Sequence, residues 1–196
     1  PDGSLVYFGT ANGLRAVQGA PSCANAWTVA GSDTIPSRPT VDLSTGNVYV
    51  GSESGVLYAF NPGGSELWRE EGLGALSASP TLALDHNLVI ISSTNANVYA
   101  LAIDPTTGTP FEELAWETLV GGGIEGSATL FEDRVYVGAF DSNVYSIDVI
   151  SGDRVWEAPF PTDREITTTP AVDRTGAVYA TSHDNVCYKL SPDRTP

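Results

Sequence analysis

The chain has 196 residues, of which 41% are hydrophobic, and it carries 24 Asp and Glu against 9 Lys and Arg, a formal net charge of −15 at pH 7. This composition is that of a globular protein with a sizeable core. The charge argues against nucleic acids and anionic membranes as partners, because both require a basic surface. No stretch approaches the roughly 20 apolar residues of a membrane span.

Two motifs recur in register along the chain. The first is tryptophan, at successive spacings of 41, 48 and 40 residues: Trp27, Trp68, Trp116 and Trp156. The second is a short β-branched and aromatic segment, found at residues 6–9, 48–51, 89–92, 135–138 and 178–181. Periods near 40 residues with short strands are typical of β-propeller blades. We therefore predict an all-β fold, a β-propeller of four-stranded antiparallel blades.

The strands of three repeats follow from Val, Ile, Tyr and Thr enrichment between turn residues. The second repeat predicts strands at 39–43, 47–52, 56–60 and around Trp68. The third predicts strands at 79–82, 88–92, 98–103 and around Trp116. The fourth predicts strands at 127–130, 134–138, 144–147 and 154–157. Nothing in the pattern predicts a helix.

The two ends of the chain carry incomplete repeats. The first blade lacks its inner strand and the fifth lacks its outer one, which gives 18 strands, or about four and a half to five blades. We expect one domain with blades at 1–31, 32–73, 74–121, 122–161 and 162–196. Since 18 is not a multiple of four, the chain is interpreted as a segment of a larger ring.

Hairpin turns occur at one phase of every repeat. They contain residues that tolerate a positive φ: Asn12-Gly13, Ser54-Gly55, Asn95-Ala96-Asn97, Asp141-Ser142-Asn143 and Asp184-Asn185. We expect each to join the second and third strands of its blade.

The segment at 146–156 shows the repeat most clearly. Asp148 is expected to accept hydrogen bonds from turn amides, and Gly152 to supply a left-handed position. Trp156 is expected to lay its ring against the neighbouring blade, with its indole N–H donating to a carbonyl. Gly108 holds the equivalent place in the third repeat, before Trp116.

This pattern resembles the tryptophan-docking repeat of the pyrroloquinoline-quinone-like propellers, over essentially the whole chain. The resemblance implies one of three activities. Some members are dehydrogenases that bind pyrroloquinoline quinone and Ca²⁺; others are cofactor-free scaffolds, such as the outer-membrane-protein assembly lipoprotein; others are sensor domains.

The adjacent cysteine pair of many such dehydrogenases is absent, because Cys23 and Cys187 stand alone. Whether those two cysteines pair is left open. We therefore favour a cofactor-free protein that is not an enzyme, with a dehydrogenase that binds pyrroloquinoline quinone and Ca²⁺ as the alternative.

The two histidines are interpreted as solvated turn residues, and the aspartates that recur once per blade as structural. His86 and His183 fall in turns on opposite faces, so they cannot share a substrate. The aspartates after the inner strands are interpreted as turn formers: Asp42, Asp85, Asp133 and Asp173. The tyrosines of the second and third strands are interpreted as core residues.

One face remains for function, made by the turns between second and third strands and the loops from outer to inner strands. Its candidate partner-binding residues are Glu53, Glu70, Glu71, Asn95, Asp141, His183 and Asp184, next to the glycine run at 121–123. We predict an extracytoplasmic scaffold or accessory subunit that binds another protein through this face, with a ligand-sensing propeller as a further alternative.

Overall fold

The computed structural model describes the chain apart from residues 1–4, 31–32 and 194–196. The described residues form 18 strands in five antiparallel sheets. The first sheet has β1 (Leu5–Thr10), β2 (Gly13–Gln18) and β3 (Asn25–Ala30), and the second has β4 (Thr40–Val41), β5 (Val48–Gly51), β6 (Leu57–Phe60) and β7 (Glu66–Glu70). The third has β8 (Thr81–Ala83), β9 (Leu88–Ser92), β10 (Asn97–Ile103) and β11 (Pro110–Leu119). The fourth has β12 (Thr129–Phe131), β13 (Arg134–Gly138), β14 (Asn143–Asp148) and β15 (Phe160–Pro161), and the fifth has β16 (Ala171–Val172), β17 (Val178–Thr181) and β18 (Cys187–Leu190).

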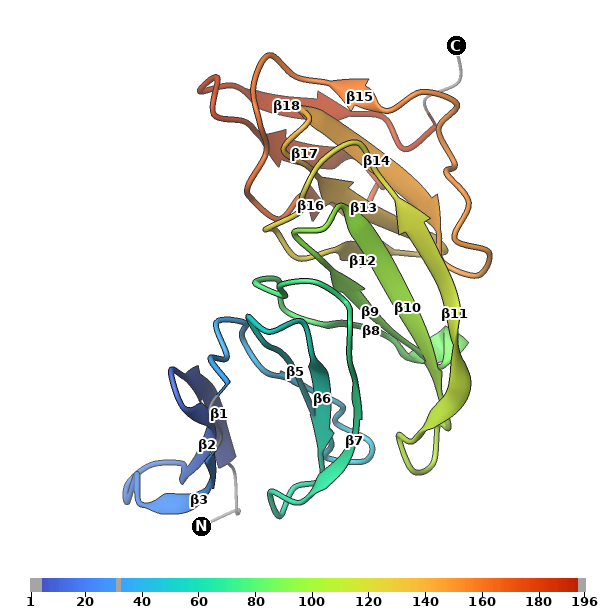
Figure 1. The fold of residues 1–196 in the computed structure, drawn as a ribbon. Coiled ribbons are helices and arrows are strands. Elements are labelled where there is room, and N and C mark those ends of the chain that lie inside the picture. The colour runs from blue at the N-terminus through green and yellow to red at the C-terminus, as the bar shows by residue number, and fades with distance from the viewer. Residues whose placement is uncertain (1–4, 31–32, 194–196) are drawn as a thin grey trace.

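The five sheets follow one another along an open arc, with the two ends of the chain at opposite ends of it (Figure 1). Within each sheet the strands pair in sequence order, as a simple antiparallel meander. This confirms the all-β fold and the 18-strand count, with three strands in each end sheet and four in each of the others. Helical structure in the described residues is limited to the 3-10 turn η1 (Leu84–His86).

The core lies between the sheets. Among the described residues four apolar clusters occur, and each joins two consecutive sheets. Every residue of β5 and β9 is buried, because a middle strand of a blade is covered on both faces by its neighbours. The near-continuous apolar runs of the sequence have this cause.

The strands of each sheet end at two opposite faces of the molecule, which we call the upper and the lower face. The upper face carries the turns between second and third strands and the loops that lead to the next sheet. The lower face carries the turns between first and second and between third and fourth strands. The upper hairpins contain the expected positive φ, at Gly13, Gly55, Ala96, Ser142 and Asn185.

The predicted outer strand at 154–157 is wrong. Only Arg154 there forms an isolated bridge, with Ile147, and the fourth strand of this sheet is β15 at Phe160–Pro161. Pro159 and Pro161 have no N–H, which limits the ladder that this segment can form. The inner strands are also shorter than predicted at their start, since Pro39 and Pro80 cannot donate to a ladder.

Candidate interaction surface

Each tryptophan ring reaches the turn after the third strand of the following sheet. The indole Nε1 of Trp27 donates to the Pro62 carbonyl at 2.9 Å. The same bond joins Trp68 to Gly108 at 2.6 Å, Trp116 to Val149 at 2.9 Å and Trp156 to Pro192 at 3.0 Å. The repeated tryptophans thus connect consecutive sheets, and their polar atoms are used within the fold.

The turn that receives Trp116 is shaped by Asp148 and Gly152. Asp148 Oδ1 accepts the backbone N–H of Ile150 and of Ser151, at 2.9 and 2.8 Å. The hydrogen bond from the Ser151 N–H is the largest influence on the pKa of Asp148 and holds it below its usual value, although burial acts in the opposite direction. Gly152 has a φ of +77° and lies against the Trp116 ring, where a Cβ would come within 2.7 Å of Cγ. These contacts hold the turn against the Trp116 ring.

Three candidates of the upper face point back into the fold. Asn95 Nδ2 donates to the Tyr99 hydroxyl at 2.7 Å, Asp184 Oδ2 accepts from Tyr188 at 2.7 Å, and Asp141 Oδ2 accepts from Tyr145. Burial and then the Asp141 hydrogen bond raise the pKa of Tyr145 to about 12. The sequence signal for this arrangement is a polar turn residue followed four positions later by tyrosine, and it was missed.

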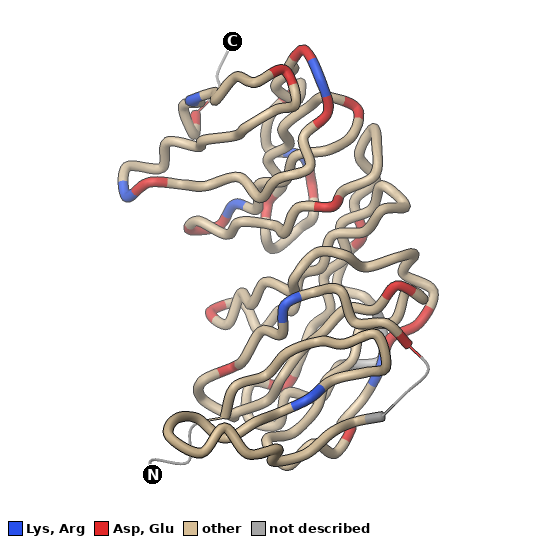
Figure 2. Tube along the Cα trace, turned by 90° about the vertical axis from the view of Figure 1, so that its left-hand side faces the viewer, with Lys and Arg blue, Asp and Glu red and all other residues tan. Residues whose placement is uncertain are grey.

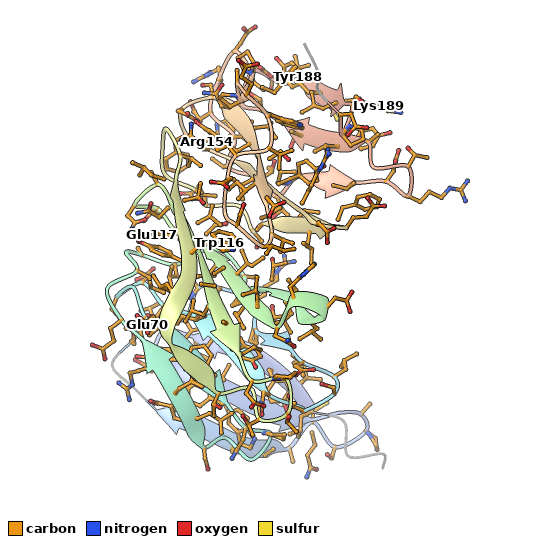
Figure 3. All side chains as sticks on the ribbon, turned by 90° about the vertical axis from the view of Figure 1, so that its right-hand side faces the viewer. Glu70, Trp116, Glu117, Arg154, Tyr188 and Lys189 are labelled. Atoms are coloured by element: carbon orange, nitrogen blue, oxygen red, sulfur yellow. The ribbon has the colours of Figure 1, made fainter. Side chains whose placement is uncertain are left out.

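Three further candidates of the upper face belong to the second sheet. Glu53 lies exposed in the turn between β5 and β6, Glu70 is half-buried at the end of β7, and Glu71 is exposed just after it. Glu71 approaches Arg69 at 4.0 Å, a surface pair that contributes little. Glu70 and Glu117, on the outer strands of consecutive sheets, lie on one side of the molecule (Figure 3). Of these carboxylates, Glu53, Glu71 and Glu117 are exposed.

The two histidines lie in separate turns, as predicted. His183 is half-exposed in the upper hairpin of the fifth sheet, with Nδ1 3.3 Å from Glu165 Oε1 and Nε2 3.0 Å from Thr167 Oγ1. His86 lies in η1 on the lower face, and its Nε2 is 3.0 Å from Asp133 Oδ1. Its side chain is only 23% exposed, so His86 is more buried than a solvated turn residue.

The recurrent aspartates differ in role. Asp42 accepts from the backbone and hydroxyl of Ser44, and Asp173 from those of Thr175, so these two form turns as expected. Asp133 instead pairs with His86, across two sheets. Cys23 and Cys187 are both free and exposed.

Negative charge is spread over the loops of the whole arc and is not confined to one face (Figure 2). Within the described residues, no group of three or more His, Cys, Asp or Glu side chains could hold a metal ion. A helix long and apolar enough to cross a membrane is likewise not found there.

Repeated four-stranded sheets joined by docked tryptophans define a β-propeller built from tryptophan-docking repeats. A family model described as "Outer membrane protein assembly factor BamB" matches residues 11–195, and the chain belongs to this family. Among curated proteins, none matches.

Two solved structures share the fold. BamB from Moraxella catarrhalis superposes with a TM-score of 0.72 at 20% sequence identity, over 100% of this chain and 60% of that one. The computationally designed Ika8 protein superposes with a TM-score of 0.73 at 14% identity, over 96% of this chain and 55% of that one. This chain therefore spans little more than half the length of these structures, and a larger ring stays a prediction.

Proposed function

We propose that this chain belongs to an extracytoplasmic scaffold propeller that binds another protein as an accessory subunit of a larger assembly. The observation that carries the proposal is the family match over residues 11–195, since the family is described as an outer membrane assembly factor. That description also supports a location outside the cytoplasm.

The partner contact is proposed for the upper face of the second sheet. Asn95, Asp141 and Asp184 are engaged by tyrosine hydroxyls, which leaves Glu53 and Glu71 as the exposed carboxylates of the candidate set. Complementary charge accelerates association and falls off with salt. The partner surface facing these residues should be basic.

Site-specific photo-crosslinking tests this placement. A photoreactive residue at position 53 should crosslink the partner in cells, while the same residue at position 65, exposed on the lower face, should not. With the partner purified, Glu53→Lys with Glu71→Lys should slow association by about tenfold at low salt. Equal crosslinking at both positions, or association that is insensitive to salt, would count against this face.

The proposed scaffold needs no cofactor. Titration of the full-length protein with pyrroloquinoline quinone and Ca²⁺, followed by quinone absorbance and dye-linked alcohol oxidation, separates the two readings. We expect no binding at micromolar quinone; stoichiometric binding with turnover would establish the dehydrogenase instead.

A further inference from the structure

A small pocket opens on the lower face between the third and fourth sheets. Its volume is about 230 Å³. This is below the roughly 300–1,000 Å³ of small-molecule sites, so the pocket suits a single side chain. Its apolar lining comes from Leu82 and Ala83 at the end of β8, Leu84 of η1 and Leu130 of β12.

The remaining lining residues are His86 and two acidic residues. The exposed residues Asp85, in η1, and Glu132, in the turn between β12 and β13, both line the pocket, and no Lys or Arg is among its described lining residues. His86 Nε2 lies 3.0 Å from Asp133 Oδ1, and this contact joins the same two turns. The walls of the pocket are therefore tied together across the two sheets before any ligand arrives.

Glu132 has an unusual backbone conformation. Glu132 is the first of the two residues that connect Phe131 to its strand partner Arg134, and its φ is +50°. Gly or Asn would adopt this conformation more readily, and a Glu there costs on the order of 1 kcal/mol. A carboxylate therefore lies beside the pocket at a turn position where the backbone conformation favours Gly or Asn.

We propose that this pocket receives an arginine side chain of a protein partner. The aliphatic stem would lie along Leu82 and Leu130, and the guanidinium would meet Asp85 and Glu132 at the mouth. Apolar side chains beside two exposed carboxylates, with no Lys or Arg among the described lining residues, are complementary to a long cationic side chain. This contact lies on the face opposite to Glu53 and Glu71, so it stands or fails separately from the upper-face contact.

Amide chemical-shift mapping on the full-length protein tests the pocket with three probes, the N-acetyl amides of arginine, citrulline and norleucine. Citrulline keeps the shape without the charge, and norleucine keeps only the stem. We expect saturable shifts at 82–87 and 130–133 with the arginine probe alone, at concentrations on the order of 1 to 10 mM. Equal shifts with citrulline or norleucine, or no shifts in that range, would overturn the proposal.

Two variants and a matched control complete the test. Glu132→Gly removes the carboxylate and favours the left-handed turn, so it should fold and weaken the arginine probe about fivefold. Asp85→Asn with Glu132→Gln should abolish the shifts. The control, Glu53→Gln with Glu71→Gln, makes the same change of net charge on the upper face and should leave binding of the arginine probe unchanged. An equal loss of binding in the control would show that overall charge, and not the pocket, causes the loss, and would overturn the proposal.

Discussion

Replacing Gly152 by alanine should destabilise the propeller through two separable effects. Gly152 has a φ of +77°, and an added Cβ would lie 2.7 Å from Trp116 Cγ and 2.8 Å from Cδ2. A left-handed non-glycine residue costs about 1–2 kcal/mol, and forcing an extra methyl into a packed contact adds about 1–3 kcal/mol. We expect the free energy of unfolding to fall by about 2–5 kcal/mol.

Gly72→Ala isolates the first of these effects. Gly72 has a φ of +82°, and nothing lies within 4 Å of a Cβ added there, so only the backbone cost of about 1–2 kcal/mol should appear. Urea unfolding of both variants, followed by far-ultraviolet circular dichroism, measures the difference. Equal losses in the two variants would refute the claim that Trp116 is held tightly against this turn.

Three further comparisons test the fold. Trp116→Ala should lower the free energy of unfolding, measured in urea, by about 3–5 kcal/mol. Trp27→Ala should lower it less, because Trp27 is only half-buried. The reverse order would contradict the docking argument. Tyr145→Phe leaves the Gly121 N–H without its acceptor and should lower the free energy of unfolding by about 1–3 kcal/mol. Tyr49→Phe should lower it by less than about 0.5 kcal/mol, since the buried Tyr49 hydroxyl has no hydrogen-bond partner in the described part of the chain. The Thr175 hydroxyl and N–H lower the pKa of Asp173 from 3.8 to about 2, so this carboxylate stabilises the fold above pH 3.8 and ceases to do so as the pH falls through 2. Asp173→Asn should therefore lower the melting temperature at pH 7 and much less at pH 2, and a deficit of the same size at both pH values would argue against this linkage.

The period of the sequence was sufficient to predict the strands of the sheet centres. The recurrent β-branched segment coincides with β5, β9, β13 and β17, because a strand covered on both faces favours apolar residues along most of its length. The glycine and polar turns likewise identified the upper hairpins. At these positions the apolar pattern and the turn residues of a single repeat are enough to predict the strand and the hairpin.

Contacts between sheets could not be read in the same way. The sequence predicts that Trp156 packs against the neighbouring blade, but not that the acceptor of its N–H is the Pro192 carbonyl, 36 residues further on. Glu132 and Asp85 gave no signal either, since the pocket beside them exists only where two sheets meet. Asn95, Asp141 and Asp184 were assigned to the surface because a polar turn residue alone does not reveal the tyrosine that engages it.

Several basic residues are engaged by aromatic rings, carbonyls and carboxylates of the chain itself. Four of the 9 stand over aromatic rings within their own sheets, at 5.2–5.8 Å from the ring centre: Arg15 over Phe8, Arg69 over Tyr58, Arg154 over Tyr145 and Lys189 over Tyr179. Arg154 also donates to the Leu119 carbonyl, and Arg134 to the Pro192 carbonyl and to Asp193. Arg69 pairs with Glu66 and, at 4.0 Å, approaches Glu71. Glu53 and Glu132 have no ion pair in the described part of the chain. A basic partner would therefore meet carboxylates such as Glu53 and Glu132 with little competition from the chain's own cations.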